Sequence, residues 1–148
     1  MKIIVDANII FSAILNTNGK IGDLLLNSGQ HFKFFSPEYL KSELNKYHFK
    51  ISKISGMTIP EITEIEFQIT RGITFLSESY IPKAILIYSL NLVKDIDEKD
   101  APYIAFTKYF RAKLWTGDKT LLKGLRKKGF KNILTTDELF KFREEKLK

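Results

Sequence analysis

The chain has 148 residues, enough for one domain with a substantial core, and its apolar fraction of 44% and charged fraction of 28% are ordinary for a globular protein. It has no cysteine and only two histidines, so disulfides and thiolate metal sites are excluded and a multi-histidine zinc site is disfavoured. The net charge is +7, and residues 108–148 hold 13 of the 24 Lys+Arg but only 5 of the 17 Asp+Glu. This basic excess suggests a polyanionic partner such as nucleic acid, with a surface charged for solubility as the alternative.

The beginning of the chain alternates between strand and helix patterns. Residues 2–5 form an apolar run that predicts a buried strand, and residues 7–15 carry apolar side chains at helical spacing. A turn then leads to a short helix at 21–27 and an aromatic strand at 32–35. Asp6 stands between the first strand and the first helix, where a carboxylate is costly unless it has a partner or a function.

The next helix is expected to begin at Ser36 and Pro37, which resemble an N-cap and a first-turn proline. Glu43 lies roughly 60° from the centre of the apolar stripe of this helix, so we expect its side chain to point partly inward. A further helix is expected at 60–69 and a strand at 73–76.

The remaining elements surround an acidic loop at 94–100. Residues 82–92, before this loop, favour a helix, although their continuous apolar character also fits a strand. After the loop we expect a helix at 101–110, a strand at 113–116, a helix at 119–128, a strand at 132–134 and a last helix capped by 135–137.

Strands separated by helices predict a three-layer α/β/α fold with a mainly parallel central sheet. We find no repeat, linker or low-complexity segment, so residues 1–148 are expected to form a single domain. The longest apolar stretch, 85–93, contains Ser89 and Asn91 and is too short for a membrane span. No secretory signal is apparent, and with the absence of cysteine this predicts a cytoplasmic protein.

Several acids are expected at the carboxyl ends of the strands, where sites form in parallel sheets. Asp6 directly follows the first strand, and Asp118 follows Thr116 by two residues. If the two strands are neighbours, the two carboxylates face one another, and a divalent cation would relieve their repulsion. Glu43 and Asp100 would complete four oxygen donors, a plausible ligand set for Mg²⁺ or Mn²⁺. The acidic pocket is therefore expected at this edge of the sheet.

Each acid also has a structural interpretation. Asp100, Asp118 and Asp137 stand at expected helix starts, where Asp is a favoured N-cap. Glu43 alone would most often be a solvated helix residue. Asp6 is the hardest to explain structurally, and the joint pattern is more specific than any of its members.

The chain resembles the PIN-domain nucleases, which include VapC-like ribonuclease toxins, over nearly its whole length. The blocks that carry the resemblance are Val5-Asp6-Ala7-Asn8, Glu43-Leu44, Asp97 to Ala105, and Trp115-Thr116-Gly117-Asp118. The resemblance implies metal ligands at Asp6, Glu43, Asp100 and Asp118, with Asp97 as a neighbour that replaces or assists Asp100. It also implies supporting hydrogen bonds from Asn8 and Thr116.

The activity that the resemblance implies is hydrolysis of phosphodiester bonds in mostly single-stranded RNA, with Mg²⁺ or Mn²⁺ activating a water. Homodimerisation and a cognate antitoxin are likewise implications of the resemblance only. A basic cluster is the candidate for contacts to the RNA backbone, with a solvated helix face as the alternative, and it comprises Lys119, Lys123, Arg126, Lys127, Lys128 and Lys131.

Two alternative functions come from other classes. A non-catalytic RNA-binding module would keep the fold and bind RNA without metal-dependent cleavage. Phosphoryl-transfer proteins are disfavoured, because the second strand ends in Phe35-Ser36 with no acceptor acid and because Asn8 stands where a dehalogenase-type site needs a second Asp.

Overall fold

The computed structural model describes residues 1–147 and is built on a five-stranded sheet in which every strand pair is parallel. The strand order is β3-β2-β1-β4-β5, so β1 is central and the order reverses between β1 and β4. The strands are β1 (Lys2–Val5), β2 (Lys33–Pro37), β3 (Ile73–Leu76), β4 (Lys113–Trp115) and β5 (Ile133–Leu134). This arrangement confirms the predicted three-layer, parallel α/β fold.

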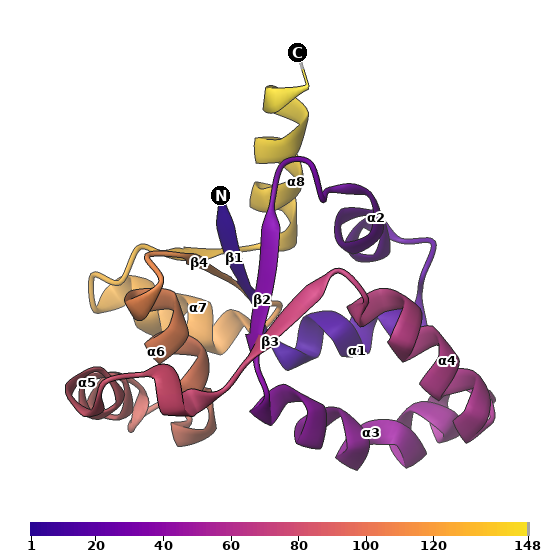
Figure 1. Ribbon diagram of the computed structural model, residues 1–148, viewed down its shortest axis with the longest axis horizontal. Helices are drawn as coiled ribbons and strands as arrows, with labels where there is room; N and C mark the ends of the chain where they lie inside the picture. The colour runs from indigo at the N-terminus through magenta and orange to yellow at the C-terminus, as the bar shows by residue number, and fades with distance from the viewer. Residues whose placement is uncertain (148) are drawn as a thin grey trace.

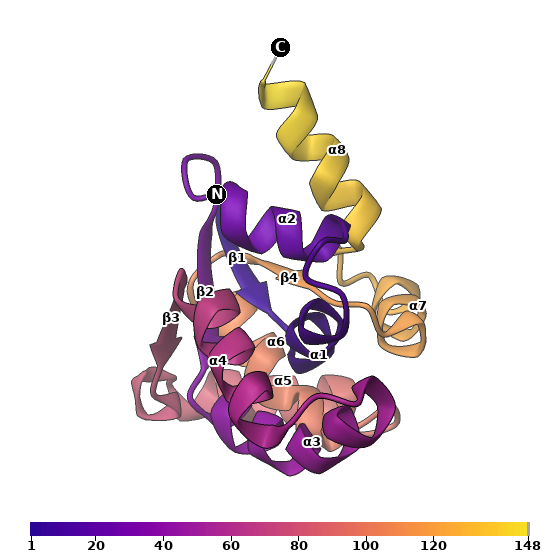
Figure 2. The same ribbon diagram turned by 90° about the vertical axis from the view of Figure 1, so that its right-hand side faces the viewer.

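Helices cover both faces of the sheet (Figure 1). Helices α1 to α4 pack against one another beside one face, whereas α5 and α6 pack together and α6 contacts β1, β2 and β4. In both views α8 and α3 lie at opposite ends of the molecule (Figure 2). The helices are α1 (Ala7–Leu15), α2 (Lys20–Asn27), α3 (Tyr39–Ser55), α4 (Ile59–Thr70), α5 (Lys83–Val93), α6 (Ala101–Tyr109), α7 (Lys119–Lys127) and α8 (Thr136–Lys146), with short 3-10 helices η1 (Glu78–Tyr80) and η2 (Glu98–Asp100).

The central strands are buried on both faces, as the continuous apolar run of β1 predicts. Ile3, Ile4 and Val5 are fully buried, and so are Leu114 and Trp115 on the neighbouring strand β4. This rigid centre fixes the position of whatever follows the carboxyl ends of β1 and β4. Within residues 1–147, none of the helices combines the length and the apolar character that crossing a membrane requires.

The predicted order of strands and helices is confirmed along the chain, and the ambiguous segment at 82–92 is the helix α5. The predicted helix start at Ser36 and Pro37 is wrong, because both residues belong to β2 and α3 begins only at Tyr39. Instead of capping a helix, the Ser36 hydroxyl donates a 2.8 Å hydrogen bond to the carbonyl oxygen of Val5 on the neighbouring strand.

Replacing Ser36 with alanine is expected to lower the free energy of unfolding by about 1–2 kcal/mol, because the buried donor to the Val5 carbonyl is lost. Urea denaturation would measure the change. Ser42→Ala is the matched control, since the Ser42 hydroxyl makes an exposed hydrogen bond within α3 and its loss should cost less than about 0.5 kcal/mol. Equal losses for the two variants would contradict a role for Ser36 in fixing the end of β1.

Candidate active site

The pairing of β1 with β4 brings Asp6 and Asp118 to the same edge of the sheet. Val5 is in register with Trp115, and the Asp6 N–H donates to the Trp115 carbonyl oxygen at 3.1 Å. Asp6 is 5% exposed and caps α1, its Oδ1 accepting from the Ala7 N–H at 2.7 Å. Asp118 caps α7 in the same manner, its Oδ1 accepting from the Leu121 N–H at 3.0 Å. The capping interpretation therefore holds for Asp118, but it uses only one of the two carboxylate oxygens.

Thr116 joins the two aspartates. Its hydroxyl donates to Asp6 Oδ2 at 2.7 Å and accepts from the Asp118 N–H at 3.0 Å. Asn8 closes the same network, because its Nδ2 lies 3.4 Å from both Asp6 Oδ2 and the Thr116 hydroxyl oxygen, while its Oδ1 accepts from the Gly117 N–H at 3.0 Å. Asn8 and Thr116 thus make hydrogen bonds of the kind predicted for them, and they lock α1 to the turn after β4.

Glu43 reaches the site from α3 and is held by Tyr103 through a contact that the sequence did not predict. Tyr103, on α6, is 1% exposed, and its hydroxyl donates to Glu43 Oε1 at 2.5 Å. Because Tyr103 follows Asp100 by three residues at the start of α6, the two lie on the same side of that helix, and this spacing was the available signal. Glu43 is therefore oriented by a buried phenol rather than left as a solvated helix residue.

The two acids near η2 differ in their surroundings. Asp97 is exposed, and its Oδ1 accepts from the Lys99 N–H at 3.0 Å. Asp100 is half-buried at the start of α6 and makes no side-chain capping hydrogen bond there. Capping therefore accounts for Asp97 and not for Asp100.

One cavity of about 310 Å³ connects these groups. Five carboxylates line it, together with the aromatic and basic side chains of α1, α3 and η2. The full lining is Asp6, Ala7, Asn8, Phe11, Glu43, Tyr47, Lys50, Asp97, Lys99, Asp100 and Asp118.

Asp6, Glu43 and Asp100 resist ionisation in this cavity. Burial raises the pKa of Asp6 to about 6, although the hydrogen bonds from Thr116 and the Ala7 N–H oppose the rise. Burial, followed by repulsion from Asp6 and the other nearby carboxylates, raises the pKa of Asp100 to about 8. Burial also raises the pKa of Glu43, against the hydrogen bond from Tyr103. A cation in the cavity would remove this penalty.

The chemistry of the donor set fits Mg²⁺ or Mn²⁺, since carboxylate oxygens are the ligands these ions prefer. Within residues 1–147, however, no three acidic or histidine side chains are already gathered closely enough to hold one ion. In this arrangement the Asp6 side chain is hydrogen-bonded to Thr116 and the Glu43 side chain to Tyr103. Ion binding at this site therefore requires side-chain rotation toward a common point.

The basic cluster of α7 is partly engaged within the chain. Arg126 donates to both carboxylate oxygens of Glu138, at 2.7 and 3.0 Å, and Lys128 pairs with Asp95. Lys119, Lys123 and Lys127 are exposed, so their predicted contact with nucleic acid stays a prediction, and none of the cluster residues up to Lys131 lines the cavity.

Lys50 and Lys99 contribute basic side chains to the lining of the cavity itself, and neither was predicted from the sequence as a site residue. The signal for Lys50 was its spacing, because it lies two helical turns after Glu43.

The model of the PIN domain family matches residues 4–138 of the chain. The chain belongs to the PIN domain family. Members of this family are generally hydrolytic nucleases. No curated protein matches the sequence significantly.

Two crystal structures share the fold of this PIN domain. The structure of PAE2754 from Pyrobaculum aerophilum matches with a TM-score of 0.69 at 14% sequence identity. The match covers 98% of this chain and 90% of the PAE2754 chain. The structure of VapBC2 from Rickettsia felis, bound to a DNA fragment from its promoter, matches with a TM-score of 0.59 at 13% sequence identity. The match covers 91% of this chain and 97% of the matched chain in that structure. At these identities the likeness shows the fold alone.

Without divalent cations, the free energy of unfolding should fall as pH rises from about 4 to 8. The folded chain keeps protons on Asp6 up to a pKa of about 6 and on Asp100 up to about 8, whereas the unfolded chain releases them near 3.8. The stability that these groups contribute is thus present below the unfolded pKa and lost as pH rises through the folded pKa.

Urea denaturation in EDTA across this pH range would measure the effect. An Asp6→Asn/Asp100→Asn variant should have the flatter profile, while Asp137→Asn, at an exposed position paired with Lys20, should follow the wild type. Parallel profiles for all three proteins would contradict the raised pKa values.

Proposed function

We propose that the protein is a Mg²⁺- or Mn²⁺-dependent endoribonuclease that hydrolyses phosphodiester bonds in mostly single-stranded RNA. The observation that carries the proposal is the convergence of Asp6, Glu43, Asp100 and Asp118 on one cavity at the switch point of a PIN domain. These residues come from four separate elements, and packing of the core alone does not require carboxylates at any of them.

The ligand roles follow from the surroundings of each acid. Asp6 and Asp118 are fixed by Thr116 at the ends of neighbouring strands, so they form the base of the site. We assign the third position to Asp100 rather than Asp97, because Asp100 is half-buried, lacks a capping hydrogen bond and is destabilised in its charged form. Glu43, held by Tyr103, would be the fourth donor.

When bound, the ion would lower the pKa of a water and neutralise charge that develops on the phosphate. The chain contributes the rest. Its carboxylates accept the proton that the water loses, and the rigid ends of β1 and β4 hold Asp6 and Asp118 in fixed positions. Lys50 and Lys99, on the cavity wall, counter the repulsion between these acids and an incoming phosphate.

The purified protein should cleave single-stranded RNA with Mn²⁺ and lose the activity in EDTA. The Asp6→Asn/Asp118→Asn variant should lose at least about 100-fold in rate, as is typical when charged groups at a reacting centre are removed. Asp137→Asn is the control and should cleave at the wild-type rate, because Asp137 is exposed outside the cavity. Gel analysis of a labelled strand would measure the rates.

Calorimetric titration with Mn²⁺ provides a second readout that does not depend on turnover. The wild type should bind the ion and the double variant should not. Equal cleavage by wild type and double variant would sink the nuclease assignment, and RNA binding without metal-dependent cleavage would establish the non-catalytic module instead.

We further propose that this nuclease is the toxin of a toxin–antitoxin pair, silenced by a cognate antitoxin and acting in the cytoplasm, with homodimerisation as an additional expectation. The support is the shared fold with the structure of VapBC2. Induced expression should therefore arrest growth, and the arrest should disappear with Asp6→Asn/Asp118→Asn. Optical density and viable counts would measure it. Normal growth at confirmed expression of active enzyme would instead favour an RNA-processing role.

A further inference from the structure

One wall of the acidic cavity is aromatic and basic. Phe11 from α1 and Tyr47 and Lys50 from α3 line it beside the carboxylates. The two rings meet edge to face, with centroids 5.6 Å apart and an interplanar angle of 80°. Lys50 Nζ lies 5.9 Å from the centroid of each ring. We refer to these three side chains as the aromatic platform.

The platform is continuous with the candidate metal ligands. Glu43, Tyr47 and Lys50 stand at i, i+4 and i+7 on α3 and therefore share one face of the helix. Phe11 follows Asn8 by three residues on α1, so it also lies on the side of that helix that carries the site. A chemical group bound on the platform would therefore lie one or two helical turns along α3 from the carboxylates.

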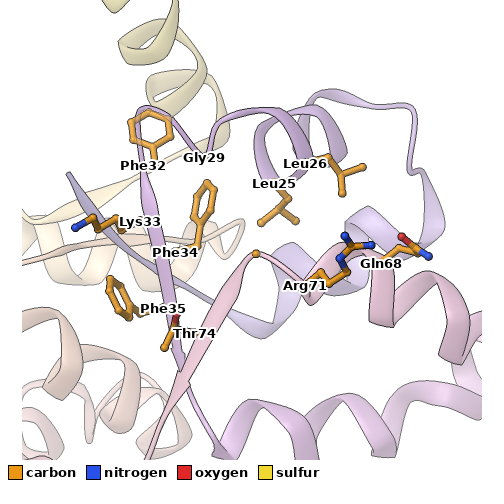
Figure 3. A pocket seen from close by; sticks show the side chains of 11 residues that line it. Leu25, Leu26, Gly29, Phe32, Lys33, Phe34, Phe35, Gln68, Arg71 and Thr74 are labelled. Carbon is orange, nitrogen blue, oxygen red and sulfur yellow. The ribbon is translucent and has the colours of Figure 1, made fainter.

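Tyr47 is not a core residue. It is 38% exposed, whereas Phe32 and Phe34, which line a larger cavity of about 550 Å³ formed by α2, β2 and the segment between α4 and β3, are 2% and 4% exposed (Figure 3). Among residues 1–147, no carboxylate lines that larger cavity. Tyr47 therefore combines an accessible aromatic ring with a position beside the acids, which neither phenylalanine does.

The charges on this wall suit a polyanion that carries flat rings. Lys50 on α3 and Lys99 on η2 line the cavity, and Lys46 is close enough to Glu43 to oppose the rise that burial causes in the pKa of Glu43. Within residues 1–147, none of these three lysines forms an ion pair with a carboxylate. Their charge is available for phosphates, and an aromatic side chain stacks on any nucleobase.

We propose that the aromatic platform binds the unpaired nucleobase adjacent to the scissile phosphate, by stacking on Tyr47, while Lys50 contacts the neighbouring backbone phosphate. The proposal rests on the proposed function for the position of the scissile phosphate at the carboxylates. It gives the preference for single strands a physical origin, because a base stacked on Tyr47 has left its own helical stack.

Fluorescence anisotropy with a labelled single-stranded oligoribonucleotide tests the proposal, with Ca²⁺ in the buffer and the strand verified intact by gel. Tyr47→Ala should weaken binding about 5- to 150-fold, the range expected for loss of one base–aromatic stack, and Tyr47→Phe should stay within about 2-fold of wild type. Lys50→Gln should weaken binding and reduce the salt dependence by about one phosphate contact.

A matched pair of controls exists on the opposite helical layer. Tyr88 on α5 is 42% exposed and carries Lys108 Nζ 4.4 Å from its ring centroid, yet neither residue lines the acidic cavity. Tyr88→Ala and Lys108→Gln should bind like the wild type. Losses as large as those of the platform variants would overturn the proposal, because any exposed tyrosine–lysine pair would then have the same effect.

An abasic scan of the oligoribonucleotide identifies the stacked base. One abasic position should weaken wild-type binding by the same factor as Tyr47→Ala, and should cause no further loss in that variant. Additive losses at every position would overturn the proposal. Equal RNA binding by wild type and Tyr47→Ala would also overturn the proposal, and it would favour a protein partner as the ligand of the platform.

The outcomes separate this proposal from the proposed function. If Tyr47→Ala cleaves and binds RNA as the wild type does, while Asp6→Asn/Asp118→Asn loses cleavage, the platform proposal is overturned and the nuclease assignment is retained. Tyr47-dependent binding of single strands, without any metal-dependent cleavage, overturns the nuclease and supports the platform as a base-binding site.

Discussion

Repulsion between carboxylates in a half-buried cavity is the constraint on which the site depends. Elsewhere in the chain, several acids are paired with bases, as Asp23 is with Arg143 and Glu138 with Arg126. Within residues 1–147, none of the six ion pairs includes a carboxylate that lines the acidic cavity. Asp6, Glu43, Asp97 and Asp118 are held instead by neutral donors, namely the Thr116 hydroxyl, the Tyr103 phenol and backbone N–H groups. Neutral donors fix the orientation of a carboxylate while leaving its charge for a cation.

The topology of the sheet creates this concentration of acids. Because β1 and β4 are parallel neighbours at the reversal of strand order, the residues after them meet at one edge. α3 then supplies Glu43 from one side of the sheet, and the start of α6 supplies Asp100 from the other. The sheet therefore brings together acids that are separated by up to 112 positions along the chain, which no local stretch of sequence can do.

Sequence patterns predicted what depends on periodicity and on general properties of parallel sheets. The order of elements followed from hydrophobic spacing, and the meeting of Asp6 with Asp118 followed from strand ends sharing an edge. Ser36 was misplaced because a Ser-Pro pair is a common helix start, and its hydrogen bond to Val5, 31 positions away, has no local signature.

The same limit explains the residues that were missed around the site. Tyr103 reaches Glu43 across 60 positions, through the packing of α6 against the sheet. Arg126 and Lys128 are tied to Glu138 and Asp95 by contacts of the same long-range kind, so a run of basic residues overstated the free charge of α7. Contacts between elements depend on how each helix is rotated about its axis, which spacing alone fixes only within a broad sector.

The acidic residues of the cavity and its basic and aromatic residues place opposite demands on a ligand. The carboxylates repel a phosphodiester, and a neutral ligand would gain nothing from the charges of Lys50 on α3 and Lys99 on η2. The proposed nucleic acid substrate would meet both demands with a cation between its phosphate and the acids, because its other phosphates can contact Lys50 and Lys99 and its base can cover the exposed ring of Tyr47. Under the proposed function, the acids would supply reactivity that is indifferent to sequence, and Tyr47 would select single strands, because the bases of a duplex are already stacked on one another.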